Sequence, residues 1–492
     1  MKKMIMFFSV IVIFSNTSVF SQSIQEISKY NVEWNTPSDN SYGAMPLGNG
    51  SEGVNSWVEP NGDLQFYISG TDFFGDDQFN IKQGKVRVKF SDNPFVRGFQ
   101  FNQTLELKEG AIVIKAGEKG KAVNIRLWMD VNNPVIHIQG TSDIERTVEV
   151  QYELWRKLKL ADSPTSQEAL YGDVVINDNT DSLIWYHQNS SATKWGQRLE
   201  TEGLGPDIKE KVKDPLQYLT FGSLMQGKGF KRSGAQSLKA TGTKNIDIAI
   251  TLLTKQCEKP EEWVNLIESK TKEYAKINSE KAFAAHKKWW GDFWERSWIN
   301  LSGFPDAYTF TQKYICQRYI NACTNRGETP VPFNGNIYNV DAPKGTWSFL
   351  GRLKTSVDAD YRAWGDLTFM WQNTRHIYYP MIASGDFDLM KPLKSYVFSS
   401  FGIAKARAKN WFGYDSAAVQ VEAVNLKGLS VFGKRLPPHL SSHFLAGIEL
   451  TAMLTDYYIF NPNEKFLADT LLPCADAYIE FFNLKFPKKD VN

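Results

Sequence analysis

The sequence contains little of what several common classes of protein depend on. Its 492 residues include four cysteines, too few for the disulfide framework of a chain this size, and no two of them have the spacing of a metal site. Lys and Arg number 56 against 54 Asp and Glu, so no excess of positive charge indicates a nucleic-acid partner. After the N-terminal region, no apolar run reaches the roughly 20 residues that a membrane span needs. We therefore predict no metal, no cofactor, no nucleic-acid partner and no membrane span.

The N-terminus has the three parts of a secretory signal peptide. Met1, Lys2 and Lys3 form a short basic region, residues 4–14 are apolar, and Ser18 and Ser21 supply the small side chains that a signal peptidase needs. This pattern predicts that residues 1–21 are a signal peptide cleaved near Ser21, and that the protein is secreted or periplasmic. A membrane anchor is the alternative, but the apolar run is shorter than a bilayer span.

Residues 22–258 are rich in segments that alternate apolar and polar side chains. Examples are KVRVKF at 85–90, NIRLWMDV at 124–131 and NIDIAITLL at 245–253, separated by Gly, Asn, Asp and Pro. A period of two is typical of strands that bury one face. These residues are therefore predicted to form a large antiparallel β-sandwich.

The period becomes helical after Pro260. Residues 259–300 are predicted to be a helical linker with one buried face, because its apolar and aromatic side chains form a stripe: Phe283, His286, Trp290, Phe293 and Trp294. Residues 301–492 contain further helical patterns, at 308–323, within 363–378, and at 388–407, 442–460 and 464–484. Helices in series joined by long loops favour an array of helical hairpins. The predicted fold class is thus multidomain, β and then α.

One stretch, WGDLTFMWQNTRHIYYPMIASGD at 364–386, combines aromatic rings with amides and charges. Buried polar side chains need hydrogen-bond partners, so a Gln-Asn-Thr-Arg run is unexpected in a core. The rings of Trp364, Trp371 and Tyr379 can stack on a sugar, and four polar side chains can orient its hydroxyl groups: Gln372, Asn373, Arg375 and Asp386. The stretch predicts a carbohydrate site, with at least half of its rings serving ordinary packing.

Three long motifs resemble those of six-hairpin glycosidases. They are WWGDFWERSWINL at 289–301, YICQRYINACTNRGETPVPFNGNIY at 314–338 and the stretch at 364–386, and the segment at 42–74 is similar to the N-terminal signature of that group. The resemblance is to glycoside hydrolase family 95 and to the related bacterial domain of unknown function 5703, from about residue 30 to the end. It implies a secreted hydrolase with an (α/α)6 barrel, exo-acting on terminal fucose- or galactose-like sugars with inversion.

The resemblance also implies roles for individual residues. In the fucosidases, asparagines in the segment that matches residues 371–373 hold the attacking water; Asn373 matches one of them, and Trp371 stands in place of the other. Glu422 occupies the place of the glutamate in a Pro-Glu-Thr motif, here within the altered sequence Gln-Val-Glu-Ala at 420–423. Glu422 and Asp366 are the candidate acid or base. A loop-capping amide is the alternative for Asn373, and a solvated surface carboxylate is the alternative for Glu422.

The part of the chain after residue 300 is short for such a barrel. Twelve helices with their loops need well over roughly 300 residues, and about 190 are present. We therefore expect an incomplete (α/α)6 barrel, weak sugar binding and little hydrolysis by this chain. Two functions stay open: a secreted glycoside hydrolase, and a non-catalytic or degenerate carbohydrate-binding protein. A helical-barrel polysaccharide lyase is less favoured, because those enzymes place helices before the sandwich. The sequence does not specify the sugar, the linkage or the anomer.

Overall fold

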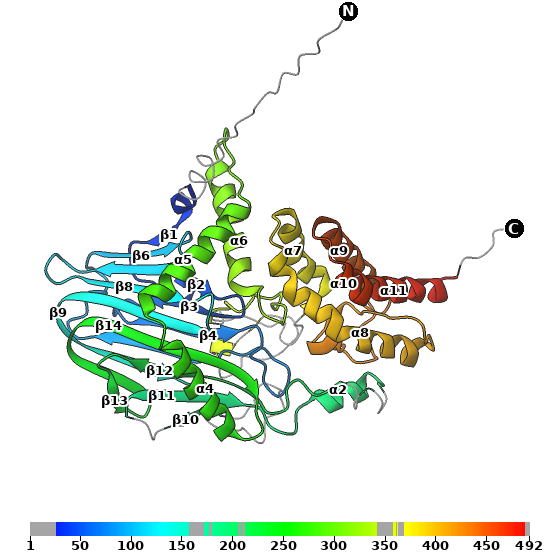
Figure 1. Ribbon diagram of the computed structural model, residues 1–492, viewed down its shortest axis with the longest axis horizontal. Coiled ribbons are helices and arrows are strands. Elements are labelled where there is room, and N and C mark those ends of the chain that lie inside the picture. Colours follow the sequence, from blue (N-terminus) through cyan, green and yellow to red (C-terminus); the bar gives the residue numbers. More distant parts are fainter. Residues whose placement is uncertain are drawn as a thin grey trace, which may run out of the picture.

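The computed structural model describes residues 26–156, 172–176, 180–204, 208, 212–341, 358–360, 362 and 369–487. Strands occupy one half of the molecule, with α4 (Pro260–Tyr274) and α5 (Ser279–Arg296) lying against them, and the later helices occupy the other half (Figure 1). Strands come first along the chain and helices follow, which confirms the predicted order. The predicted signal peptide, Trp364 and Asp366 lie outside the described residues.

Among the described residues, 14 strands form one antiparallel sheet. They are β1 (Val32–Trp34), β2 (Met45–Gly48), β3 (Glu52–Val58), β4 (Leu64–Gly70), β5 (Gly84–Phe90), β6 (Phe101–Glu106), β7 (Ala111–Ala116), β8 (Val123–Met129), β9 (Val135–Glu153), β10 (Val174–Ile176), β11 (Ser182–Gln188), β12 (Leu219–Gly227), β13 (Lys231–Gly234) and β14 (Ser237–Gln256). The main path runs in the order β1-β6-β7-β8-β9-β14-β12-β11-β10, and β2 to β5 join it through β9.

The two longest strands, β9 and β14, connect two layers of this sheet. β9 pairs with β8 through residues 136–142 and with β5 through residues 148–153. The register of β14 against β9 shifts between Ala240 and Asn245, where β9 changes from one partner to the other. Such irregularities bend a strand and increase its twist, so the sheet folds over and β2 packs against β7 and β8. The N-terminal part is the predicted β-sandwich.

Strands β3 and β4 are buried on both faces, whereas the burial of β5 alternates along the strand. One face points into the core of the sandwich, and α6 (Ala307–Thr324) and the segment after it lie near the other. Tyr319 on α6 donates a hydrogen bond to the carbonyl of Pro46 at 3.1 Å, and Tyr338 donates to that of Leu47 at 3.0 Å. These contacts hold the start of the helical half against the sandwich.

Helix α5 packs the predicted stripe of side chains against its neighbours. All five members of the stripe are buried, and Trp290 stacks on Tyr319 of α6 with ring centroids 4.9 Å apart. His286 accepts a hydrogen bond from the N–H of Val131 at 3.3 Å, and its other ring nitrogen lies 2.8 Å from the carbonyl oxygen of Glu109. Because both nitrogens bind backbone groups, His286 is a core residue.

The remaining described helices are α2 (Trp195–Thr201), α7 (Trp371–Ala383), α8 (Lys391–Phe412), α9 (Ala446–Phe460), α10 (Glu464–Phe466) and α11 (Leu472–Lys485). The helix predicted at 464–484 is interrupted by a π-helical turn at Leu467–Leu471, and Pro473 then occupies the first turn of α11, where no intrahelical N–H is needed. The helix predicted from 442 begins at Ala446. No helix of the described parts is both long and apolar enough to span a membrane.

Candidate functional site

Helix α7 begins directly after a short strand that a distant segment holds in place. β15 (Phe369–Met370) pairs with β16 (Ala423–Val424), which brings Glu422 to the first turn of α7. The N–H of Trp371 donates to the Glu422 carbonyl at 2.9 Å, and the N–H of Gln372 donates to Glu422 Oε1 at 2.5 Å. The residue before α7 provides no side-chain cap, so Glu422 caps the helix from 50 positions away.

A second carboxylate contacts the same turn. Glu449, in the first turn of α9, accepts a hydrogen bond from Trp371 Nε1 at 2.8 Å and one from the Arg375 guanidinium at 2.5 Å. Trp371 is buried, while the side chains of Arg375 and Glu449 are half-buried. The five residues Trp371, Gln372, Arg375, Glu422 and Glu449, called here the α7 cluster, therefore combine a buried floor with a rim that solvent reaches.

Burial raises the pKa of the Glu422 carboxyl, which belongs to a residue only 8% exposed. The hydrogen bond from Gln372 and the charges of His443 and Arg375 partly lower this pKa, and the negative charge of Glu449 raises it further. The net shift is upward and favours the protonated form. A buried carboxyl group with a raised pKa is a candidate for general acid catalysis.

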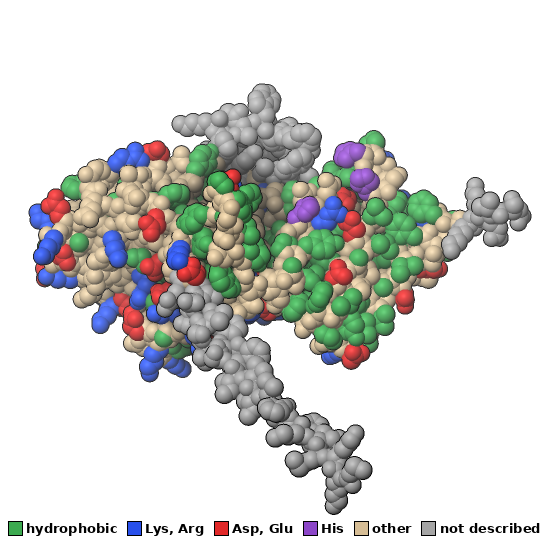
Figure 2. Space-filling view, turned by 90° about the horizontal axis from the view of Figure 1, so that it is seen from above, with side chains coloured by type: hydrophobic (Ala, Val, Ile, Leu, Met, Phe, Trp, Pro, Cys, Tyr) green, Lys and Arg blue, Asp and Glu red, His purple; other side chains and the backbone are tan. Residues whose placement is uncertain are grey.

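Three histidines of the described residues are exposed, one of them on α7. These are His376, His439 and His443. Figure 2 shows histidine side chains on the helical half, with basic and acidic side chains near one of them. In the parts of the chain that the structure describes, no group of three His, Cys, Asp or Glu side chains has the geometry to hold a metal ion.

The structure places four of the residues predicted from the sequence in the α7 cluster: Trp371, Gln372, Arg375 and Glu422. Asn373 is exposed on the first turn of the same helix, and Tyr379 is exposed about two turns further along it. The structural positions of Trp364 and Asp366 are not described. Tyr378, next to Tyr379 in the sequence, is fully buried. The helix therefore turns one of these two adjacent rings inward and the other outward.

Asp386 lies apart from the α7 cluster, beyond the C-terminal end of α7, a helix about 18 Å long. It is 1% exposed and accepts hydrogen bonds from Arg318 Nε at 2.7 Å and Nη2 at 2.8 Å. The hydroxyl of Ser384 donates to the same carboxylate at 2.6 Å. Both carboxylate oxygens are thus engaged in joining the end of α7 to α6.

Glu449 was not anticipated from the sequence, although a signal for it exists. It is the one charged residue in the run from Phe444 to Leu454, which is otherwise apolar apart from Gly447 and Thr451. A charge inside an apolar helix needs a partner, because its burial without one is costly. That argument predicts a paired carboxylate in α9 but not the identity of its partners, which come from α7.

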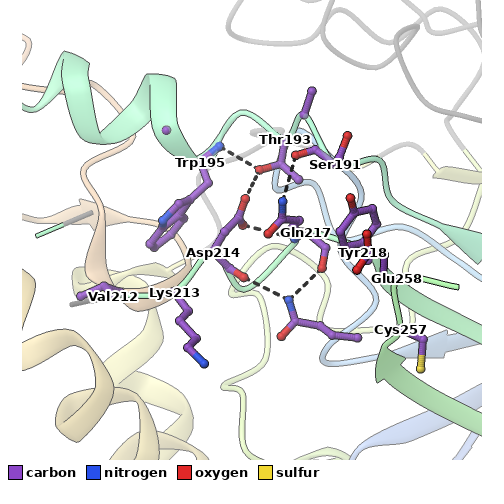
Figure 3. Close-up of a pocket in the computed structure, with 13 residues that line it drawn as sticks. Ser191, Thr193, Trp195, Val212, Lys213, Asp214, Gln217, Tyr218, Cys257 and Glu258 are labelled. Atoms are coloured by element: carbon purple, nitrogen blue, oxygen red, sulfur yellow. Dashed lines mark hydrogen bonds between the residues drawn. The ribbon is translucent and has the colours of Figure 1, made fainter. Parts of the chain in front are cut away.

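A pocket of about 580 Å³ lies in the β half, beside α2 (Figure 3). Many of its polar groups bind one another. Asp214 accepts hydrogen bonds from the N–H of Leu216 at 2.8 Å and from the hydroxyl of Thr193, and Gln256 Nε2 donates to the carbonyls of Asp214 and Gln217 at 3.0 and 2.9 Å. Among the predicted residues that the structure describes, none lines this pocket. The α7 cluster is therefore the candidate functional site.

Comparison with known proteins gives one family match and a set of structural likenesses. The family model described as Domain of unknown function (DUF5703) matches residues 33–299. No curated protein is significantly similar in sequence. A solved structure assigned as a kojibiose phosphorylase from the human microbiome has a TM-score of 0.56 and 14% identity, over 92% of this chain and 59% of that one.

Two further solved structures match less closely. One is a bacterial glucoamylase complexed with acarbose, with a TM-score of 0.38 and 10% identity over 91% of this chain and 60% of that one. The other is a family GH92 α-mannosidase from Bacteroides thetaiotaomicron, with a TM-score of 0.29 and 9% identity over 88% of this chain and 64% of that one. The first of the three structures establishes a shared fold. The chain spans about three fifths of the length of these proteins.

Proposed function

Since this chain belongs to the family of the Domain of unknown function (DUF5703), whose model matches more than half of it, we propose that it is a glycoside hydrolase of the six-hairpin type. The likeness to the protein assigned as a kojibiose phosphorylase supports a sandwich followed by helices of an (α/α)6 barrel. The motif resemblance supports an exo-acting, inverting enzyme for terminal fucose- or galactose-like sugars of polysaccharides. Residues 1–21 would direct it to the periplasm or the exterior.

The environment of Glu422 is the observation that carries this proposal. Its carboxyl group is buried, has a raised pKa and lies beside Arg375, which can donate hydrogen bonds to a sugar. In hydrolysis with inversion, a carboxylic acid protonates the leaving oxygen while a base removes a proton from the water that attacks the anomeric carbon from the other face. We assign the acid to Glu422 and the base to Asp366.

The other predicted residues take supporting roles in this proposal. Asn373, exposed on the first turn of α7, holds the attacking water, and Gln372 and Arg375 bind hydroxyl groups of the sugar. Tyr379 and Trp364 offer aromatic faces for stacking. The indole of Trp371 is largely buried, so it acts mainly by holding Glu449. Asp386, which the sequence suggested as a sugar-binding residue, is assigned to anchoring α7 because Arg318 occupies its carboxylate.

A non-catalytic carbohydrate-binding protein is the second candidate. Inversion requires a second carboxylate free to take a proton from water. Glu449 is the second carboxylate of the α7 cluster, and both Arg375 and Trp371 donate hydrogen bonds to it. Because it is held in this ion pair, Glu449 is better suited to a structural role than to that of a base. A site without a free base would bind a sugar but would not hydrolyse it.

Hydrolysis of a series of fucosides and galactosides that differ in leaving group tests the proposal. If Glu422 is the acid, Glu422→Gln should lower kcat/KM about 100- to 10,000-fold for methyl glycosides, whose leaving group needs a proton. The loss should be much smaller for dinitrophenyl glycosides, whose leaving group does not. Glu464→Gln, at an exposed residue of α10, is the control and should change neither rate.

The outcomes separate the two candidates. Sugar binding by calorimetry with no release from any substrate would support the binding protein and contradict the hydrolase. Equal losses on both kinds of leaving group would contradict the role of Glu422 as the acid, because a residue that only shapes the site affects all substrates alike.

A further inference from the structure

A second pocket, of about 280 Å³, lies between the sheet and the joint between α4 and α5. Strands β9, β12 and β14 and the loop after β8 line one side, and the end of α4, the residues that follow it and the start of α5 line the other. Polar residues that line it include Asp130, His137, Gln226, Asp247, Thr271 and Tyr274. All of them lie in the β half or on α4, and none belongs to the α7 cluster.

Two side chains in this pocket, Thr271 and His137, make no hydrogen bond with any described residue, and the Thr271 hydroxyl is itself buried. Thr271 is 5% exposed, and its hydroxyl makes no hydrogen bond with any described residue. His137 is 9% exposed, and within the described parts of the chain neither of its ring nitrogens has a hydrogen-bond partner. The ring of His137 is held by stacking on Trp128, with centroids 4.1 Å apart and planes at 10°. Stacking therefore fixes the position of the imidazole ring, while its two nitrogens are left to bind a ligand or water.

In the pocket beside α2 in Figure 3, Trp195 Nε1 is also unpaired among the described residues, but several other polar groups of the wall bind one another. There, Asp214, Gln217 and Gln256 are joined by hydrogen bonds within the pocket wall. Here, the hydroxyl of Thr271 and the imidazole of His137 remain unpaired. A ligand group that pairs the buried Thr271 hydroxyl would make a hydrogen bond that the described residues leave unmade.

The charges around the pocket limit what can bind. Burial, and to a smaller extent the charge of Arg126, lowers the pKa of His137 to about 4, so the imidazole is neutral near pH 7. No Lys or Arg is among the residues that line the pocket. Asp130 and Asp247 supply carboxylates, each with a pKa that burial raises. An anion would meet these two carboxylates, and the nearby cations Arg126 and Lys228 lie outside the lining. A neutral molecule rich in hydroxyl groups would find donors and acceptors together.

We propose that this pocket is an accessory binding site for one neutral sugar ring. Hydroxyl groups of the sugar would pair with the His137 imidazole, the Thr271 hydroxyl and the carboxylates. The neutral imidazole and the hydroxyl can each donate and accept a hydrogen bond, and a carboxylate accepts. The volume of the pocket suits a single ring rather than a chain. Because its walls come from the sheet and from α4, an occupied pocket would also hold α4 and the start of α5 to the sandwich.

Calorimetric titration of the whole protein tests the proposal, with D-glucose, D-galactose, D-mannose and L-fucose as probes, and with inorganic phosphate and ethanolamine as the anion and cation. We expect saturable binding of at least one sugar and none of phosphate. Thr271→Val and His137→Phe should each weaken that binding about tenfold or more, which corresponds to one lost hydrogen bond. Both substitutions preserve shape, and His137→Phe keeps a ring that can stack on Trp128.

Two controls locate the binding. Thr451→Val removes a buried hydroxyl of α9 that already donates to the Gly447 carbonyl at 2.8 Å, and it should not change the affinity. Glu422→Gln should also preserve this binding, so loss of hydrolysis and loss of the accessory site can be told apart. The imidazole nitrogen shifts of His137 in NMR spectra should change when the sugar is added.

Three results would overturn the proposal. The first is the absence of saturable binding by every sugar, which would mean that the pocket holds only water. The second is sugar binding that both Thr271→Val and His137→Phe leave unchanged, because it would lie elsewhere. The third is binding of ethanolamine in place of the sugars, which would make this a site for cations.

Discussion

Arg407 of α8 and Glu202, which follows α2, form an ion pair in which both side chains are fully buried, although 205 positions separate them. Arg407 Nη2 lies 3.0 Å from Glu202 Oε2, and Arg407 Nη1 donates to the carbonyl of Val419 at 3.1 Å. The backbone N–H of Ser430 donates to the same glutamate. This pair ties a loop of the β half to the helical half.

We expect Arg407→Met to lower the free energy of unfolding by about 3–5 kcal/mol, because it leaves the Glu202 carboxylate buried without its cation. The double variant Arg407→Met with Glu202→Leu should recover much of this loss, since neither charge remains. Urea unfolding followed by tryptophan fluorescence measures both. A single variant as stable as the parent protein would show that the pair does not hold the two halves together.

The anchoring role of Asp386 predicts a loss of stability rather than of sugar affinity. Asp386→Ala removes the partner of the buried Arg318 and should lower the free energy of unfolding by about 3–5 kcal/mol. Asp388→Ala is a matched control two positions away, where the exposed ion pair with Arg296 is worth about 1 kcal/mol or less. If Asp386→Ala instead weakened sugar binding without destabilising the fold, Asp386 would belong to the binding site.

Acid should destabilise the protein through His286. Burial lowers the pKa of this histidine from 6.5 to about 4, so the unfolded chain binds more protons than the folded chain between these values. Its contribution to stability is complete above about pH 6.5 and is lost as the pH falls toward 4, by about 3 kcal/mol. His286→Gln should be less stable at pH 7 but lose less on acidification. Parallel pH dependence in both proteins, measured by urea unfolding, would contradict this account.

The roles proposed for neighbouring residues of α7 predict opposite kinetic effects. Asn373→Ala should lower kcat with little change in KM, because a group that positions water acts mainly in the transition state. Gln372→Ala should mainly raise KM, because a group that binds a sugar hydroxyl holds substrate and transition state alike. Initial rates on an aryl fucoside or galactoside measure both. Equal effects of the two substitutions on kcat and KM would remove the distinction between their roles.

Exposed apolar side chains gather on the helical half (Figure 2). They include Phe398, Leu445, Ile459, Phe460, Leu472, Ile479 and Phe486. Large exposed patches of this kind favour association. The double variant Ile459→Lys with Phe460→Glu should therefore bind less of a hydrophobic dye and stay monomeric at higher concentration, with stability unchanged because both side chains are exposed. Phe99→Glu, at an exposed residue of the β half, is the control. A parent protein that neither binds dye nor associates would contradict the prediction.

The sequence by itself determined the elements that depend on local patterns. Alternation over KVRVKF predicts β5, and the spacing of Phe283, His286, Trp290 and Trp294 predicts both α5 and its buried face. Such patterns succeed because side-chain direction repeats every two residues in a strand and every 3.6 in a helix, whatever lies around the element. The order of sandwich and helices followed from the same patterns, and the aromatic and amide-rich stretch contains the start of α7.

Only the tertiary structure decided what the polar residues near α7 contact. Asp386 and Gln372 lie in the same stretch of sequence, yet one is held by Arg318 and the other binds Glu422 through its backbone. Glu449 joins Trp371 although 78 positions separate them. A local pattern carries no information about such pairs, because the partner of a buried charge is the group that packing brings within hydrogen-bond distance, and that depends on how whole helices meet.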